Sequence, residues 1–167
     1  VNNISTKEDG SDFIFNGEKF ETQLIGEFNV YNAAAAIVVA ISQGIEIEKI
    51  KSVLKKVSAP AGRMEVVATH PFRVVVDYSY EPKSLESALS AVKVFKPKRI
   101  IAVVGSAGGG RDRWRRPVMG EVADKFSDVV FVTTDDPYDE SPDKIVDEVL
   151  AGVLKNKKRV LDKNVFR

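Results

Sequence analysis

The stretch VVGSAGGGRDRWRRPVMG, from Val103 to Gly120, decides how the chain folds. An apolar run enters it, four glycines interrupt it, and four arginines follow within six residues. A strand that ends in a glycine turn before a helix is the building unit of α/β folds. The spacing nearly matches the phosphate-binding loop pattern G-x-x-x-x-G-K-[ST], but Arg111 and Asp112 replace the lysine and the hydroxyl residue. The stretch therefore indicates the fold and leaves the ligand of the turn open.

The same alternation of strand and helix runs through the second half of the chain. Apolar runs predict strands at 72–79, 99–105 and 128–134, with one more possible start at 158–162. Helical periodicity predicts helices at 82–95, 115–126 and 141–154. Pro117 and Pro142 stand near the first positions of two of these helices, where a missing N–H costs nothing, and Ser141 is a candidate N-cap. We expect a Rossmann-like, mostly parallel sheet flanked by helices.

The first half of the chain has a different pattern. Residues 12–26 read as two short strands around an Asn16-Gly17 turn. An alanine-rich helix, expected to be buried on most sides, follows at 29–44, and an amphipathic helix at 46–57. The segment SAPAGR at 58–63 contains a proline and a glycine and is the best linker candidate. We expect one domain portion over residues 1–64 and another over 65–167.

Composition narrows the classes of function. The 167 residues include no cysteine and a single histidine, His70, which argues against disulfides, thiolate metal sites, a His-rich metal site and a Ser-His-Asp triad. No metal ligand is assigned. The net charge of +1 gives no reason to expect nucleic acid or a membrane, and no apolar run approaches about 20 residues. The expected compartment is the cytoplasm.

Polar residues gather at the ends of three predicted strands, at 77–79, 105–112 and 133–138, which a parallel sheet would bring to one rim. The glycine turn with its arginines fits an anion, because helix N-termini and guanidinium groups both attract negative charge. A solvated basic helix start, or a nucleic-acid patch with Trp114 interleaved, are the alternatives. Asp77 could accept ribose hydroxyls or serve as an ordinary turn residue.

Other polar residues also allow two interpretations. Asp135 and Asp136 could hold a ligand ammonium or form a common Asx turn. Asn29 and Asn32 could each cap the first helix, which is the frequent role of asparagine at such positions. Arg63, after Gly62, could be a plain surface residue.

Five segments in fixed order resemble the Mur ligase family: GEFNVYNAAAA, GRMEVV, VVVDYSYEPKSLE, GGGRDRWRRPVMG and DDPYDESPDKIVDEV. The resemblance runs from about Gly26 to Val153 and is strongest to the enzymes that add the third residue to UDP-N-acetylmuramoyl-dipeptide in peptidoglycan synthesis. It implies a three-domain, ATP- and Mg²⁺-dependent ligase that acts through an acyl phosphate and takes a free amino acid. The chain resembles the end of the central ATP-binding domain plus most of the C-terminal domain. It carries no triphosphate-binding loop, so the 167 residues alone are expected to be inactive.

The resemblance also implies roles for single residues. The ATP-binding positions are Asn29 and Asn32, near the adenine, and Arg63 and Asp77, at the ribose or phosphates. Arg111 matches the arginine that grips the carboxylate of the incoming amino acid. The specificity motif for that amino acid comprises Asp135, Asp136, Pro137 and Tyr138.

Two departures from the family pattern bear on the substrate. Enzymes that add meso-diaminopimelate usually have Asn at position 136 and Arg at position 138, whereas this chain has Asp136 and Tyr138. The second carboxylate of diaminopimelate would lose its cationic partner, unless Arg113 or Arg115 replaced it, so an amino acid with one carboxylate, such as lysine, is expected. The alternative function is a non-catalytic module that binds a nucleotide, an amino acid or nucleic acid.

Overall fold

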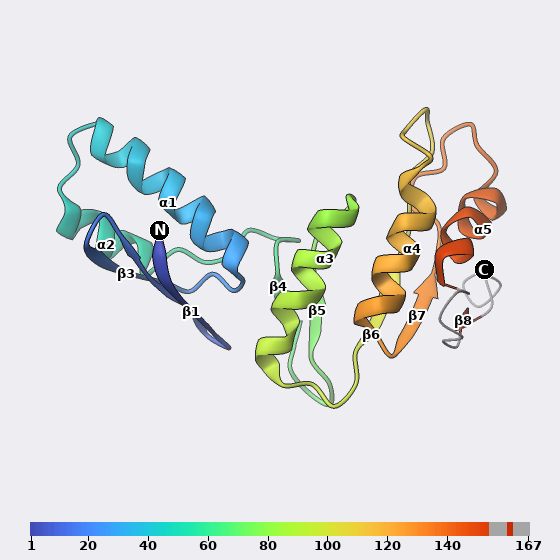
Figure 1. Cartoon of the computed structure of the whole chain (residues 1–167), viewed down its shortest axis with the longest axis horizontal. Helices are drawn as coiled ribbons and strands as arrows, with labels where there is room; N and C mark the ends of the chain where they lie inside the picture. The colour runs from blue at the N-terminus through green and yellow to red at the C-terminus, as the bar shows by residue number, and fades with distance from the viewer. Residues whose placement is uncertain (154–159, 162–167) are drawn as a thin grey trace. The chain divides into compact units, whose positions relative to one another are not determined.

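A computed structural model describes residues 1–153 and 160–161 of the chain (Figure 1). The chain divides into two compact units: Val1–Tyr78 with Ala91–Lys96, and Ser79–Ser90 with Pro97–Arg167. The expected division after residue 64, which follows the linker candidate at 58–63, stays a prediction.

The first unit begins with a three-stranded antiparallel meander. Strands β1 (Asn2–Lys7), β2 (Gly10–Phe15) and β3 (Glu18–Thr22) lie in the order β1-β2-β3. The predicted turn is confirmed, because Asn16 and Gly17 link β2 to β3 with φ values of 50° and 82°.

Helices α1 (Glu27–Ser42) and α2 (Ile47–Leu54) complete a small core around this meander. The Phe13 and Phe20 rings stack in it, with their centroids 5.7 Å apart. The helices contribute the remaining buried apolar side chains of the cluster: Val30, Ala33, Ile37, Ile50 and Leu54.

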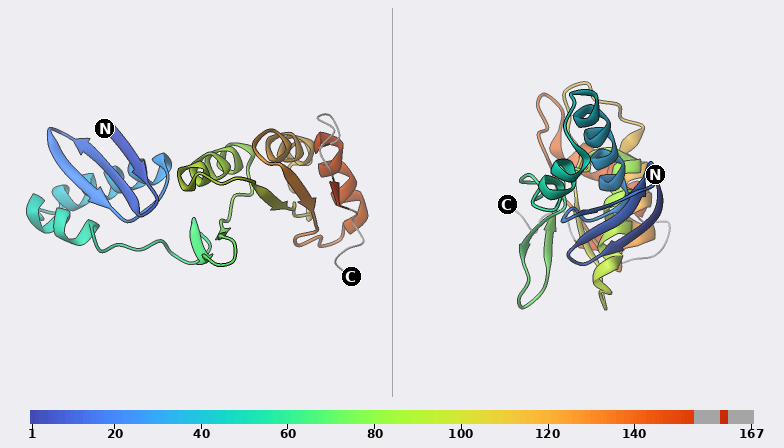
Figure 2. Two further views of the ribbon diagram at one scale, coloured as in Figure 1. Left: turned by 90° about the horizontal axis from the view of Figure 1, so that it is seen from below. Right: turned by 90° about the vertical axis from the view of Figure 1, so that its left-hand side faces the viewer.

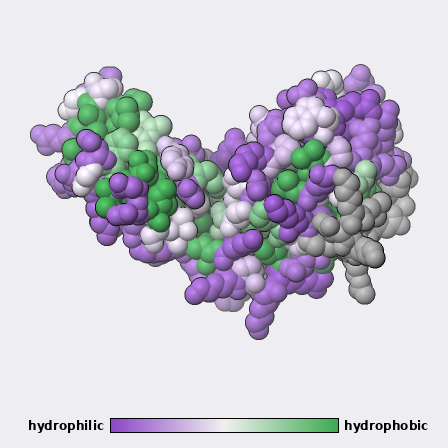
Figure 3. All heavy atoms as spheres, viewed as in Figure 1, coloured by the Kyte–Doolittle hydropathy of each residue, from purple (hydrophilic) through white to green (hydrophobic). Residues whose placement is uncertain are grey.

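Helix α1 is covered on one side only, so the expectation of burial on most sides was wrong. Val30 and Ile37 are buried, but Val38 and Val39 are 52% and 61% exposed. A helix that is apolar all round is normally enclosed, and here the described residues supply cover for a single face. Figure 3 shows hydrophobic side chains gathered on the surface of this part of the chain.

Strands β4 (Glu65–Ala68) and β5 (Val74–Val76) form a separate antiparallel pair. The predicted strand at 72–79 is therefore shorter than expected, and its membership of a parallel sheet was wrong. Chain neighbours joined by so short a connection can pair only in antiparallel fashion, since a parallel pair needs a long crossover. Sequence reasoning missed β4 altogether.

The second unit contains the predicted parallel sheet. Strands β6 (Ile101–Val104), β7 (Val129–Val132) and β8 (Val160–Leu161) pair in parallel, in that order. The helices are α3 (Pro82–Ala91), α4 (Arg115–Phe126) and α5 (Pro142–Val153). Helix α3 gives way to a 3₁₀ turn, η1 (Val92–Phe95), before the predicted end. The α/β class with a mostly parallel sheet is confirmed.

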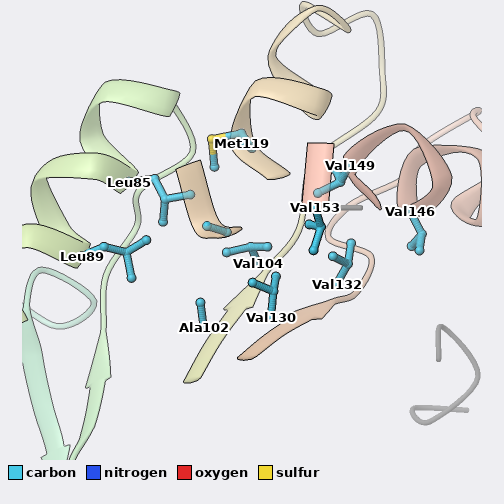
Figure 4. Close-up of a cluster of buried hydrophobic side chains, with 11 residues drawn as sticks. Leu85, Leu89, Ala102, Val104, Met119, Val130, Val132, Val146, Val149 and Val153 are labelled. Carbon is cyan, nitrogen blue, oxygen red and sulfur yellow. The ribbon is translucent and has the colours of Figure 1, made fainter. Parts of the chain in front are cut away.

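The core of the second unit lies between one face of the sheet and the helices. Alternate side chains of β6 and β7 point toward α3, α4 and α5 (Figure 4) and form a buried cluster with them: Ala102, Val104, Val130, Val132, Leu85, Leu89, Met119, Val146, Val149 and Val153. Figure 2 shows α3 and α4 on the same side of these strands. The intervening residues Ile101 and Val103 are 55% and 65% exposed.

Helices α4 and α5 approach each other at two glycines. A Cβ on Gly152 would lie 1.9 Å from the Pro117 carbonyl oxygen, and a Cβ on Gly120 would lie 2.0 Å from that of Val149. This contact fixes α5 against the helix that follows the glycine turn. No helix in the described part of the chain is long and apolar enough to cross a membrane.

Candidate functional site

Two loops meet at the carboxyl ends of β6 and β7. The glycine loop, residues 105–112, follows β6, and the acidic loop, residues 133–141, follows β7. The Gly108 N–H donates a 2.8 Å hydrogen bond to the Asp136 carbonyl oxygen, and the Thr133 N–H donates one of 3.0 Å to that of Val104. Two of the three predicted strand ends therefore do converge on one rim.

The glycines let the two loops touch. A Cβ on Gly108 would lie 2.1 Å from the Pro137 carbonyl oxygen, so no side chain fits there. Gly109 has φ of +68°, and a Cβ on it would lie 2.8 Å from the Tyr138 ring. The space beside these two glycines is filled by the acidic loop. Their lack of a side chain therefore allows the two loops to pack together, and it leaves no room there for a ligand.

Three of the four arginines after the turn are engaged by carboxylates. Arg113 pairs with Glu148, and Arg115 pairs with Glu81 while its Nε lies 3.3 Å from the Asp112 carbonyl oxygen. The hydrogen bond to Glu148 raises the pKa of Arg113 above its already high usual value. The interpretation as a solvated basic helix start is therefore wrong for Arg115 and Arg116, whereas the Arg113 side chain remains 49% exposed.

Arg116 is the most deeply buried of the four, with a side chain that is 1% exposed. Its guanidinium donates to both carboxylate oxygens of Glu140 at 2.9 Å, to Glu148 at 2.7 Å and to the Ala107 carbonyl oxygen at 3.1 Å. Sequence reasoning gave Arg116 no role of its own. A usable signal existed, because Arg116 shares the buried face of α4 with Met119, Gly120 and Ala123 at helical spacing.

Arg111 differs from its neighbours. It is exposed, and among the residues that the structure describes it makes no ion pair and no side-chain hydrogen bond. It lies near the end of the glycine loop, so its guanidinium is free to donate hydrogen bonds to an anion.

The acidic loop offers complementary groups. Asp135, Asp136 and Tyr138 are all exposed, and within the described ranges neither carboxylate is engaged by another side chain. Tyr138 has φ of 52°, an uncommon conformation for a bulky residue. A free guanidinium on one loop and two free carboxylates on the adjoining loop suit a zwitterion that carries a carboxylate and an ammonium.

The two asparagines lie inside α1 rather than at its cap. Gly26 holds the N-cap position, so the capping interpretation of Asn29 and Asn32 was wrong. The buried Asn29 side chain donates to the Ile25 carbonyl oxygen at 2.8 Å, and Asn32 Nδ2 donates to Asn29 Oδ1 at 3.1 Å. Asn32 is exposed and is oriented by this chain of hydrogen bonds.

Arg63 and Asp77 lie next to the paired strands β4 and β5, Arg63 just before β4 and Asp77 directly after β5. An Asp77 carboxylate oxygen accepts a 2.8 Å hydrogen bond from the Met64 N–H, and the Tyr78 N–H donates to the Gly62 carbonyl oxygen at 2.9 Å. The Arg63 guanidinium stacks over the exposed Tyr78 ring at 4.9 Å. Asp77 thus has a structural role, as the interpretation as an ordinary turn residue predicts. Its contact with the ribose of ATP stays a prediction.

Asp77 belongs to the first unit, whereas the glycine and acidic loops belong to the second. The residues predicted to bind the amino acid therefore lie on two joined loops of the second unit. Arg63 and Asp77, predicted to bind ATP, lie beside the paired strands β4 and β5 of the first unit. No group of three or more His, Cys, Asp or Glu side chains placed to hold a metal ion occurs within residues 1–153 and 160–161.

Comparison with known proteins agrees with this geometry. Residues 62–165 match the family model described as Mur ligase, glutamate ligase domain. The chain belongs to the Mur ligase family.

Among its relatives is the UDP-N-acetylmuramoyl-L-alanyl-D-glutamate–2,6-diaminopimelate ligase of Aquifex aeolicus, 41% identical over 150 residues, which are 89% of this chain and 31% of the relative. The ligase of the same name from Syntrophomonas wolfei is 42% identical over 155 residues, 90% of this chain and 32% of the relative. The chain thus spans about a third of the length of the curated relatives it matches.

Solved structures show the same fold. A UDP-N-acetylmuramoyl-L-alanyl-D-glutamate–2,6-diaminopimelate ligase matches with a TM-score of 0.57 and 26% identity over 97% of this chain and 34% of that one. MurC, the UDP-N-acetylmuramate–alanine ligase of Thermotoga maritima, matches with a TM-score of 0.74 and 21% identity over 96% of this chain and 36% of that one. The folylpolyglutamate synthase of Mycobacterium tuberculosis, solved with ADP and AMPPCP, has a TM-score of 0.73 at 18% identity, covering 98% of this chain and 38% of that one.

Proposed function

We propose that this chain is part of an ATP-dependent ligase that adds the third amino acid to UDP-N-acetylmuramoyl-dipeptide in peptidoglycan synthesis. The observation that carries the proposal is the pair of joined loops, in which Arg111 is free on one loop and Asp135, Asp136 and Tyr138 are exposed on the other. The family membership and the names of the relatives support the same reaction class.

In such a reaction the substrate carboxylate takes the terminal phosphoryl group of ATP, and ADP leaves. The amine of the free amino acid then attacks the acyl phosphate, an amide forms, and phosphate leaves. Arg111 holds the α-carboxylate of the incoming amino acid by a forked, charge-assisted pair. The acidic loop receives the other end of that amino acid. Both contacts restrict the amine to one approach, which is the main catalytic contribution of positioning residues.

The first unit contributes to nucleotide binding in this proposal. Asn29 and Asn32 lie near the adenine, and Arg63 and Asp77 contact the ribose or the phosphates. The Arg63 guanidinium, stacked over the exposed Tyr78 ring, fits a nucleoside phosphate chemically. Mg²⁺ is expected to accompany ATP, although the described residues form no group of three or more His, Cys, Asp or Glu side chains that could hold it. A cytoplasmic location also stays a prediction.

We further infer that the amino acid carries a single carboxylate, with lysine as the leading candidate. The relatives are named as diaminopimelate ligases, and these names state the substrate of the relatives, not that of this chain. In this chain Arg113 and Arg115, the alternative partners for a second carboxylate, are already paired with Glu148 and Glu81. Freeing Arg115 would break its ion pair with Glu81, and freeing Arg113 would leave Glu148 paired with Arg116 alone. The Asp136 carboxylate would repel a second carboxylate and attract an ammonium.

A competition assay tests this proposal. A complete ligase that contains this chain is supplied with ATP, UDP-N-acetylmuramoyl-dipeptide and equal concentrations of lysine, ornithine, alanine and meso-diaminopimelate. We expect the lysine product to dominate. Preference for meso-diaminopimelate would refute the single-carboxylate inference and retain the ligase. Absence of any amide product, with binding of ATP or amino acid intact, would favour a non-catalytic binding module.

A further inference from the structure

We infer that Arg116 is a positioning residue that holds the acidic loop against the glycine loop and so sets the shape of the amino-acid site. The inference rests on the proposed function, because it concerns how that site keeps its geometry. The Arg116 side chain is buried, so it acts through the two loops and not by touching the amino acid.

The guanidinium of Arg116 is the common point of three segments. It binds Ala107 in the glycine loop, Glu140 in the acidic loop and Glu148 in α5. The bond to Glu140 is bidentate, which fixes the orientation of the carboxylate as well as its distance. Since Arg116 lies in the first turn of α4 and Glu148 lies in α5, the two loops of the site are tied to two helices of the scaffold.

The acidic loop needs such an anchor. Tyr138 adopts a positive φ that non-glycine residues avoid, and such a conformation persists only where the surroundings hold it. One anchor lies two residues before it, where Gly108 N–H binds the Asp136 carbonyl oxygen. The other lies two residues after it, where Glu140 meets Arg116. The Glu140 N–H also donates a 3.0 Å hydrogen bond to the Pro137 carbonyl oxygen, which closes a turn around Tyr138.

The charges of the cluster are balanced. Arg113 and Arg116 face Glu140 and Glu148, so two cations meet two carboxylates. The hydrogen bond from Arg116 lowers the pKa of Glu140, and that from Arg113 lowers the pKa of Glu148, with Arg116 contributing further. Lysine at position 116 would keep the charge but could not span the three acceptors, because an ammonium lacks the planar fork.

Hydrogen exchange on the 167-residue chain tests the positioning role without any ligand. The variants are Arg116→Lys and Glu140→Gln, and Glu86→Gln serves as the control, since it removes only the exposed Lys83–Glu86 pair. We expect the Gly108 amide, which binds Asp136, to exchange about tenfold faster in both variants, with β6 and β7 amides unchanged. An unchanged Gly108 rate would overturn the inference. Equal acceleration throughout the sheet would also overturn it, because it would indicate only a global loss of stability.

Steady-state kinetics on a complete ligase that contains this chain provide the second arm. Arg116→Lys is expected to raise the KM for the amino acid about tenfold and to leave the KM for ATP unchanged, with Arg111→Ala as the reference for direct contact. An effect of Arg111→Ala without one of Arg116→Lys would refute the positioning role and keep the proposed function. If the complete protein forms no amide at all, the proposed function fails, and the exchange rate of Gly108 still decides whether Arg116 holds the loop.

Discussion

Replacing Gly108 with alanine probes the contact between the two loops directly. Gly108 has no positive φ, so alanine brings no conformational penalty of that kind, and the whole effect comes from the added methyl group. That group would lie 2.1 Å from the Pro137 carbonyl oxygen and 2.8 Å from its carbon. Ordinary contact begins near 3.4 Å, so one loop must move by 3.4 − 2.1 = 1.3 Å.

Such a shift has two costs. Forcing a methyl group against backbone atoms costs about 1–3 kcal/mol of unfolding free energy. The same movement breaks the hydrogen bond from Gly108 N–H to the Asp136 carbonyl oxygen, which contributes about 1 kcal/mol. We therefore expect Gly108→Ala to lower the unfolding free energy by about 2–4 kcal/mol, and to shift the urea midpoint by roughly 1 M or more.

The assay is urea unfolding together with NMR of the Tyr138 ring, which lies against the glycine loop. Gly110→Ala is the control in the same loop, because a Cβ there meets nothing within 4 Å and only its φ of +76° is strained. The control should cost about 1–2 kcal/mol and leave the Tyr138 signals in place. Unchanged Tyr138 signals and an unchanged midpoint in Gly108→Ala would refute the loop contact.

Three further predictions concern packing, pH and the exposed helix face. Gly152→Ala should destabilise the chain by about 2 kcal/mol in urea unfolding, since its Cβ would meet the Pro117 backbone at 1.9 Å; a neutral result would contradict the α4–α5 contact. The lowered pKa values of Glu140 and Glu148 predict stability that is present above the unfolded pKa of about 4.3 and is lost as pH falls through the folded values. The melting temperature should therefore drop toward acid, and less so in Glu140→Gln; equal drops would count against the cluster. Val39→Lys should change the unfolding free energy by no more than about 0.5 kcal/mol, because this side chain is 61% exposed; a loss of several kcal/mol would contradict the exposure of this face of α1.

The second unit could be predicted well because its signals are local. An apolar run, a glycine turn and a helix start with proline define β6, α4, β7 and α5 with little ambiguity, and Pro142 begins α5 as predicted. The meeting of the two loops also follows from sequence, since the ends of adjacent parallel strands share a rim.

Partners distant in sequence could not be predicted in the same way. The four arginines after the turn look alike in sequence, and only the fold shows that Glu140 and Glu148 occupy Arg116 while Arg111 stays free. The apolar composition of α1 predicts burial, but composition does not say whether the chain itself supplies the cover. The strand at 74–76 reads as apolar in any sheet, and its pairing depends on β4, which carries too weak a signal.

The most direct test of the central claim, that Arg111 and the acidic loop bind the incoming amino acid, is the pair of KM values in an Arg111→Ala variant of a complete ligase that contains this chain. Loss of a charge-assisted pair costs about 1.5–3 kcal/mol, so the KM for the amino acid should rise about ten- to a hundredfold while the KM for ATP stays unchanged. Equal rises in both values, or no change in either, would contradict the account.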